Sequence, residues 1–193
     1  MDTRERLIES TRDLLWDRGY VGTSPKAIQE RSGAGQGSMY HHFGGKQDLA
    51  HAAIDRSATE LITRTDAELG GPGTVAARVA RYMRRERAAL RGCPVGRLTM
   101  DPEVIANPDL RQPVGDAFAA VRDRLAAVLD EGRGNGELDP SIDPMAVAMT
   151  LIAVLQGGYV VARASGSADS YTQAVEGVLG LLACRTRTGW QEA

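Results

Sequence analysis

The chain has 193 residues, of which 42% are hydrophobic and 25% are charged, and its formal net charge is −2. These values are ordinary for a globular protein, and they exclude a polycation, so any binding of nucleic acid must use a local surface. The chain holds only two cysteines, Cys93 and Cys184, which excludes a disulfide framework and favours a reducing compartment.

Apolar residues recur at spacings of three and four from the start of the chain, which predicts amphipathic helices and no strands. Gly19 is suited to end the first helix, and Ser24 followed by Pro25 is suited to begin the second. The first segment also lacks the apolar core of a signal peptide. In this part of the chain we expect four helices, at about 3–18, 25–32, 36–42 and 46–68.

The segment Gly70–Gly73, which also contains a proline, is the strongest break in the pattern. The longest apolar stretch, 145–164, is interrupted by polar residues and by two adjacent glycines, so we expect a buried helix there rather than a membrane span. The fold class that follows is all-α with about nine helices. Beyond the break we expect five helices, at about 74–90, 96–106, 107–131, 143–165 and 169–185.

Two short helices joined by a turn that contains glycine form the arrangement of a helix-turn-helix motif, and residues 25–42 fit it. Met39 and Phe43 are four residues apart and can anchor the second helix to the domain. Its remaining residues are then free to reach base edges or phosphates in a major groove. These candidate DNA-reading residues are Gln36, Gly37, Ser38, Tyr40 and His41.

Phosphate contacts need positive charge and the free amide groups at helix N-termini. Thr23 and Ser24 offer such a terminus, Lys26 adds a charge beside it, and Lys46 offers both at the start of the next helix. Although residues 1–50 carry no net charge, the stretch from Arg31 to Gln47 contains no acidic residue. The alternative is an ordinary three-helix core with a solvated polar face.

The run from Gly19 to Lys46, and above all Gly37–Phe43, resembles the DNA-binding domain of the TetR (tetracycline-repressor-like) transcriptional regulators. This resemblance implies an all-helical homodimer that binds operator DNA and responds to a small-molecule effector. Gly35 and Gln36 depart from the family pattern, because a hydroxyl and a basic residue are common at these positions. The implied domains are 1–47 for DNA binding and 48–193 for ligand binding and dimerisation.

The remainder of the chain resembles the ligand-binding domain of the same family. Gly92–Gly96 and Leu155–Gly158 resemble a branch that includes sensors of electrophiles, in some of which the cysteine matching Cys93 is reactive. The other interpretation of Cys93 is a small buried residue at a helix break. The candidate effector contacts, chosen from helices expected to face inward, are Tyr82, Met83, Cys93, Leu98, Phe118, Gln156 and Tyr159.

The last two expected helices are more apolar than one core stripe requires, which favours a four-helix interface between two copies, the alternative being that these residues serve the internal core only. No set of nucleophile, base and acid stands out, no Cys-His spacing suggests zinc, and no glycine pattern predicts a cofactor. We therefore expect a cytoplasmic transcriptional repressor, without catalytic residues, metal, cofactor or membrane, that leaves a palindromic operator when an effector binds. The alternative is a helical small-molecule-binding protein or enzyme with an incidental helix-turn-helix.

Overall fold

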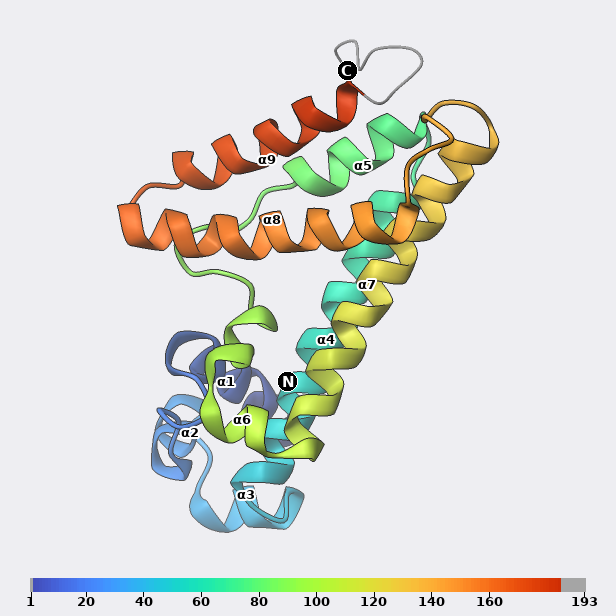
Figure 1. Ribbon diagram of the computed structural model, residues 1–193. Coiled ribbons are helices and arrows are strands. Elements are labelled where there is room, and N and C mark those ends of the chain that lie inside the picture. Colours follow the sequence, from blue (N-terminus) through green and yellow to red (C-terminus); the bar gives the residue numbers. More distant parts are fainter. Residues whose placement is uncertain (1, 185–193) are drawn as a thin grey trace. The chain divides into compact units, whose positions relative to one another are not determined.

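The computed structural model describes residues 2–184, and in this range the chain forms nine α-helices, one 3-10 helix and no strand (Figure 1). The sequence predicted this fold class and this number of α-helices. The elements are α1 (Thr3–Arg18), α2 (Pro25–Ser32), α3 (Gln36–His42), α4 (Lys46–Gly70), α5 (Val75–Arg84), η1 (Gly96–Met100), α6 (Pro102–Ala106), α7 (Pro108–Gly134), α8 (Pro144–Ser165) and α9 (Asp169–Ala183).

The chain divides into two compact units. Among the described residues, the N-terminal unit contains residues 2–61 and Cys93–Ala117, and the C-terminal unit contains Ile62–Gly92 and residues 118–184. Because α4 and α7 each contribute residues to both units, the division by packing falls inside two helices. The functional boundary after residue 47 stays a prediction.

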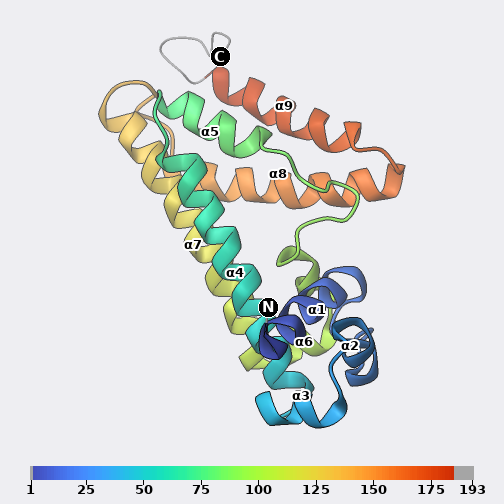
Figure 2. The same ribbon diagram turned by 180° about the vertical axis from the view of Figure 1, so that it is seen from behind.

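The N-terminal unit is built around α1, which contacts both α2 and α3 and lies beside them in both views (Figures 1 and 2). Its apolar face is fully buried. On its polar side, the Arg12 guanidinium pairs with Glu9 at 2.8 Å and with Glu60 of α4. Arg56 of α4 pairs with Glu5 at 3.0 Å, so ion pairs join α1 to α4.

In the C-terminal unit, α8 and α9 run side by side (Figure 1). The rings of Tyr159 and Tyr171 stack with their centroids 4.9 Å apart. A Cβ at Gly158 would lie 3.0 Å from the Tyr171 ring, so the glycine allows this close approach. By length and composition alone α8 could cross a membrane, because its most apolar part has a mean hydropathy of 1.9. A helix in the core of a globular protein can have the same length and hydropathy.

The largest difference from the sequence prediction is the end of α5, which stops at Arg84 rather than near Leu90. Arg85 is extended, with ψ at 147°, and the side chain of Arg87 turns back to donate to the carbonyls of Tyr82 and Met83. These carbonyls lie in the last turn, where helix termination leaves them without backbone partners. The guanidinium therefore satisfies them and allows the chain to leave the helix.

Smaller differences occur elsewhere in the chain, and the first of them follows from local chemistry. The helix expected over 96–106 is divided at Asp101 into η1 and α6, because Asp101 caps the helix that Pro102 begins. α7 continues to Gly134, three residues beyond the expected end. The last helix was expected to reach Arg185, which lies outside the described residues, and α9 ends at Ala183.

Candidate nucleic-acid interface

The helix-turn-helix geometry comes from short-range capping. The Ser24 hydroxyl accepts a hydrogen bond from the amide of Ala27 at 3.1 Å, and Pro25 is the first residue of α2. At the other end, Gly33 adopts a left-handed conformation, with φ at 65°, which turns the chain toward α3. This is the start and stop that the sequence predicted.

α3 is held by two apolar side chains and presents its polar residues outward. Met39 is fully buried and Phe43 is 4% exposed. Tyr40 is 51% exposed, which is high for an aromatic side chain and leaves its ring and hydroxyl available to a partner. Among the other candidate DNA-reading residues on this helix, Ser38 is half-buried. The remaining three are exposed: Gln36, Gly37 and His41.

Nothing inside the protein requires glycine at position 37. A Cβ built there would meet no heavy atom within 4 Å, and the same holds for Gly35, the residue that precedes α3. A glycine inside a helix costs roughly 0.5–1 kcal/mol relative to alanine. The empty space at Gly37 is therefore suited to the close approach of something outside the chain.

At the start of α2, the candidate phosphate contacts have different environments. Thr23 is 1% exposed, and its hydroxyl donates to the carbonyl of Gly19 at 2.7 Å, so its side chain supports the preceding turn. Ser24 is exposed, although its hydroxyl also caps α2. Lys26 is fully available to solvent, with its Nζ 3.9 Å from Glu30. Contact between these residues and DNA stays a prediction.

Lys46 begins α4 and lies across an aromatic ring. Its Nζ is 3.8 Å from the centroid of the Tyr20 ring, which is a cation–π contact. Burial lowers the pKa of Lys46, and the negative charges of Glu103 and Asp101 partly oppose that change. The ammonium is thus held in a fixed, half-buried position rather than on a free side chain.

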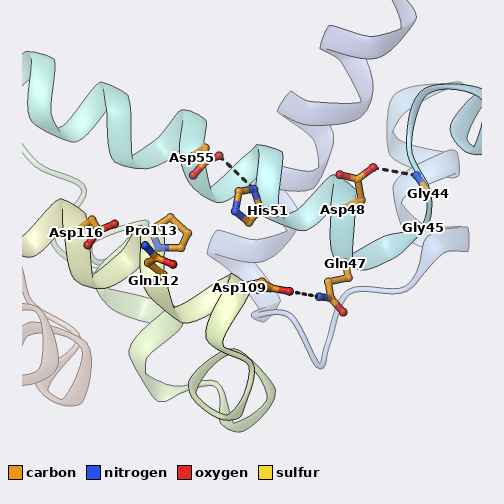
Figure 3. Close-up of a pocket in the computed structure, with 10 residues that line it drawn as sticks. All are labelled: Gly44, Gly45, Gln47, Asp48, His51, Asp55, Asp109, Gln112, Pro113 and Asp116. Atoms are coloured by element: carbon orange, nitrogen blue, oxygen red, sulfur yellow. Dashed lines mark hydrogen bonds and ion pairs between the residues drawn. The ribbon is translucent and has the colours of Figure 1, made fainter.

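An acidic groove of about 680 Å³ lies beside the start of α4, entirely within the N-terminal unit (Figure 3). Side chains from α4 and α7 line it, and several pair with each other. Asp55 lies 3.2 Å from His51, while Asp109 accepts a hydrogen bond from Gln47 at 3.2 Å. The four carboxylates in the lining are Asp48, Asp55, Asp109 and Asp116. Since carboxylates repel phosphates, the exposed side of α3 is the better surface for DNA.

The candidate effector contacts are divided between the two units. In the C-terminal unit, Tyr82, Met83 and Tyr159 are buried. Phe118 and Gln156 of the same unit are half-buried.

The other two effector candidates, Cys93 and Leu98, lie in the N-terminal unit and are buried. The Cys93 sulfur accepts a hydrogen bond from the amide of Gly96 at 3.2 Å, so it takes part in the turn that leads into η1. Arg97, a cation close to Cys93 in the sequence, donates to the Asp17 carbonyl at 2.9 Å.

Two residues with specific environments escaped the sequence analysis. Asp101 is a buried carboxylate, and the Asp-Pro pair that it forms with Pro102 is a capping signal that could have identified it. Arg85 is one of six arginines between positions 78 and 91, and a run of charges of this kind usually forms a solvated face. Within residues 2–184, no group of three His, Cys, Asp or Glu side chains could hold a metal ion.

Known families match most of the chain. Residues 73–178 match the family model described as "Tetracyclin repressor-like, C-terminal domain", and residues 7–53 match "Bacterial regulatory proteins, tetR family". The HTH-type transcriptional repressor AcnR of Corynebacterium efficiens is 26% identical over 187 residues, which cover 97% of this chain and 94% of that protein. The HTH-type transcriptional repressor NemR of Escherichia coli K12 is 24% identical over 189 residues, 94% of each chain.

Solved structures agree with the fold. A TetR transcriptional regulator from Chloroflexus aurantiacus superposes with a TM-score of 0.85 at 25% identity, covering 97% of both chains. The reduced form of E. coli NemR gives a TM-score of 0.81 at 24% identity and covers 92% of this chain and 95% of that one. The two short helices described above therefore occur in a fold shared over nearly the whole chain.

Proposed function

The chain belongs to the TetR family of DNA-binding transcriptional regulators, and from this we propose that it is a repressor released from a palindromic operator by a small molecule. Regulators of this family bind operator DNA as dimers and bind small-molecule effectors. The domains in this proposal are residues 1–47 for DNA binding and 48–193 for effector binding and dimerisation.

The exposed face of α3 is the observation that carries the proposal. Its apolar residues are used to hold the helix, and its polar residues are left outside. In this assignment Gln36 and Ser38 face bases, while Tyr40 and Lys46 contact phosphates, with Gly37 allowing the backbone to approach closely. Such a helix is short enough to enter the major groove with its first residues against base edges.

Apolar side chains that are exposed on α8 and α9 support assembly as a homodimer. Val160 is 65% exposed and Leu181 is 74% exposed, although both helices also contribute to the core. Further exposed apolar residues on α8 are Met145, Met149 and Val161. A second copy that covers this surface would place two α3 helices in successive major grooves, about 34 Å apart, on a near-palindromic site.

The effector in this proposal binds in the C-terminal unit, against Tyr82, Met83 and Tyr159 and beside Phe118 and Gln156. These are apolar groups with few polar ones, as ligand pockets require. A coupling of roughly 1–3 kcal/mol between effector and operator would be sufficient for regulation. The protein then acts in the cytoplasm, where the DNA is.

The test is a footprint on the intergenic DNA that flanks the gene. We expect protection of a near-palindrome by a protein that sediments at twice the chain mass. Gln36→Ala should change the preference among operator variants, while Thr63→Ala, on an exposed part of α4, should leave it unchanged. Failure to bind any flanking fragment at micromolar concentration would contradict the proposal.

The dimer surface can be tested separately. Val161→Asp places a charge in the exposed apolar part of α8 and should shift the protein toward monomer in sedimentation and weaken operator binding. Ile105→Asp changes an exposed apolar residue of the N-terminal unit and should leave the dimer intact. If both variants sediment as wild type, the interface lies elsewhere.

A further inference from the structure

Arg85 has a buried guanidinium nitrogen that no group in the described part of the chain accepts a hydrogen bond from. It follows α5, its guanidinium lies over the Tyr82 ring at 5.6 Å, and its Nη1 is buried without a hydrogen-bond partner among the described residues. A buried donor without a partner is unfavourable by about 1–3 kcal/mol, and by more for a charged group. Such an atom calls for a physical reason.

A second arginine makes the region more positive. The Arg87 guanidinium lies 5.3 Å from the same Tyr82 ring, so the ring has two cations near it. Arg87 donates to the carbonyls of Tyr82, Met83 and Arg85, which are neutral acceptors and leave its charge in place. Burial, followed by the charge of Arg87, lowers the pKa of Arg85. Both groups therefore favour the arrival of a negative charge.

Two of the proposed effector contacts, Tyr82 and Tyr159, are among the groups that act on Arg85. The Tyr82 ring lies 5.6 Å from the Arg85 guanidinium, Tyr82 and Tyr159 both raise the pKa of Arg85, and both residues are buried in the C-terminal unit. The carboxylate of Glu68 also favours the charged form of Arg85, but its effect is the weakest of the groups around it. A guanidinium beside apolar and aromatic walls is an arrangement that recognises an organic anion.

Resting on the proposed function, we propose that the effector is an organic acid whose carboxylate is bound by Arg85 and whose apolar part lies against Tyr82, Met83 and Tyr159. The guanidinium offers a planar pair of donors that matches the two oxygens of a carboxylate. The guanidinium already lies over the Tyr82 ring, so less side-chain freedom is lost when the acid binds.

The experiment compares short carboxylic acids with their uncharged amides. Phenylacetate and octanoate are each tested against phenylacetamide and octanamide, by thermal unfolding and equilibrium dialysis of the full chain. We expect at least one acid to raise the unfolding midpoint by about 3 °C or more at saturation, while its amide does not. If no acid of the panel binds more tightly than its amide, the assignment is overturned.

Variants identify the residue responsible. Arg85→Gln should lose the response to the acid, and Arg85→Lys should retain part of it. Arg84→Gln is the matched control: it removes the same charge one residue earlier, from an exposed side chain that pairs with Glu176, and should keep the full response. Circular dichroism verifies that each variant is folded. An equal response in wild type and Arg85→Gln would refute the role of Arg85.

Two further measurements are needed. One distinguishes a simple counter-ion from an organic effector, and the other distinguishes failure of this inference from failure of the proposed function. Inorganic phosphate tests for a simple counter-ion: if it gives the whole Arg85-dependent shift and the acids add nothing, the effector assignment is wrong. Operator binding by wild type is measured in the same samples. A protein that binds its operator but distinguishes no acid from its amide contradicts this inference alone, whereas a protein that binds no operator contradicts the proposed function.

Discussion

The carboxylate of Asp101 accepts a hydrogen bond from the amide of Val21, which is 80 residues earlier in the chain, at 3.0 Å. Its other oxygen accepts from the amides of Glu103 and Val104 at the start of α6. A Cβ at Gly19 would lie 2.7 Å from the same carboxylate, and Gly19 also has a positive φ of 71°. One buried side chain thus caps α6 and holds the turn between α1 and α2.

Asp101→Asn should destabilise the protein by about 1–3 kcal/mol, because an amide cannot accept at both positions and leaves a buried N–H without a partner. For a chain of this length this corresponds to a fall in unfolding midpoint of about 2–4 °C per kcal/mol. Asp116→Asn is the control, since that carboxylate is exposed, and its midpoint should stay close to wild type. Equal midpoints for both variants would show that Asp101 does not hold the turn.

Gly37→Ala should weaken operator binding without lowering stability. The added methyl group meets nothing inside the protein, so any loss of affinity arises at the DNA. Gly115→Ala is a matched control: it lies in the interior of α7, is also exposed, and has an equally empty surrounding. Both variants should unfold at or above the wild-type midpoint, and only Gly37→Ala should reduce binding in a titration. If Gly37→Ala binds the operator as tightly as wild type, glycine at position 37 is not needed for close approach to DNA.

Lys46→Ala should weaken binding to all DNA sequences alike, since a phosphate contact carries no base information. A plot of the logarithm of the association constant for DNA against the logarithm of the salt concentration should have a slope that is smaller in magnitude by about one. Tyr20→Phe keeps the ring under the ammonium and should keep the slope. An unchanged slope in Lys46→Ala would mean that the Tyr20 contact, rather than DNA, is the role of this lysine.

The two cysteines should differ in reactivity toward N-ethylmaleimide. Cys184 is exposed and should be alkylated first, whereas Cys93 is buried and should react more slowly, as followed by mass spectrometry. In the wild type, operator binding should be lost as Cys93 is alkylated. The treated Cys184→Ser protein should lose operator binding in the same way, whereas the treated Cys93→Ser protein should keep it. Release that remains in Cys93→Ser would reject a thiol switch at this residue.

Features set by neighbouring residues were predictable from the sequence. α1 ends at Arg18 because Gly19 can adopt positive φ, and α2 begins at Pro25 because Ser24 caps it. The anchoring of α3 by Met39 also follows from spacing alone. At both helix boundaries the controlling interaction spans four residues or fewer.

Features set by distant residues or by a single side chain were not predictable in the same way. The apolar pattern continues past Arg84, yet the helix ends there because Arg87 turns back on its last carbonyls. Nothing near Asp101 in the sequence indicates Val21 as its partner. The burial of Thr23 was also not predictable, because a threonine at this position could equally contact a phosphate or form an internal hydrogen bond.

The ion pairs between α1 and α4 have a consequence for how the protein finds its site in a genome. Arg12 and Arg56 are paired with carboxylates, and Arg31 lies 3.0 Å from Asp13, so these cations are already neutralised before DNA arrives. Attachment to arbitrary sequence depends on unpaired positive charge. With few such charges, less of the protein is held on the many decoy sites of a chromosome, and more of it is free to find the operator.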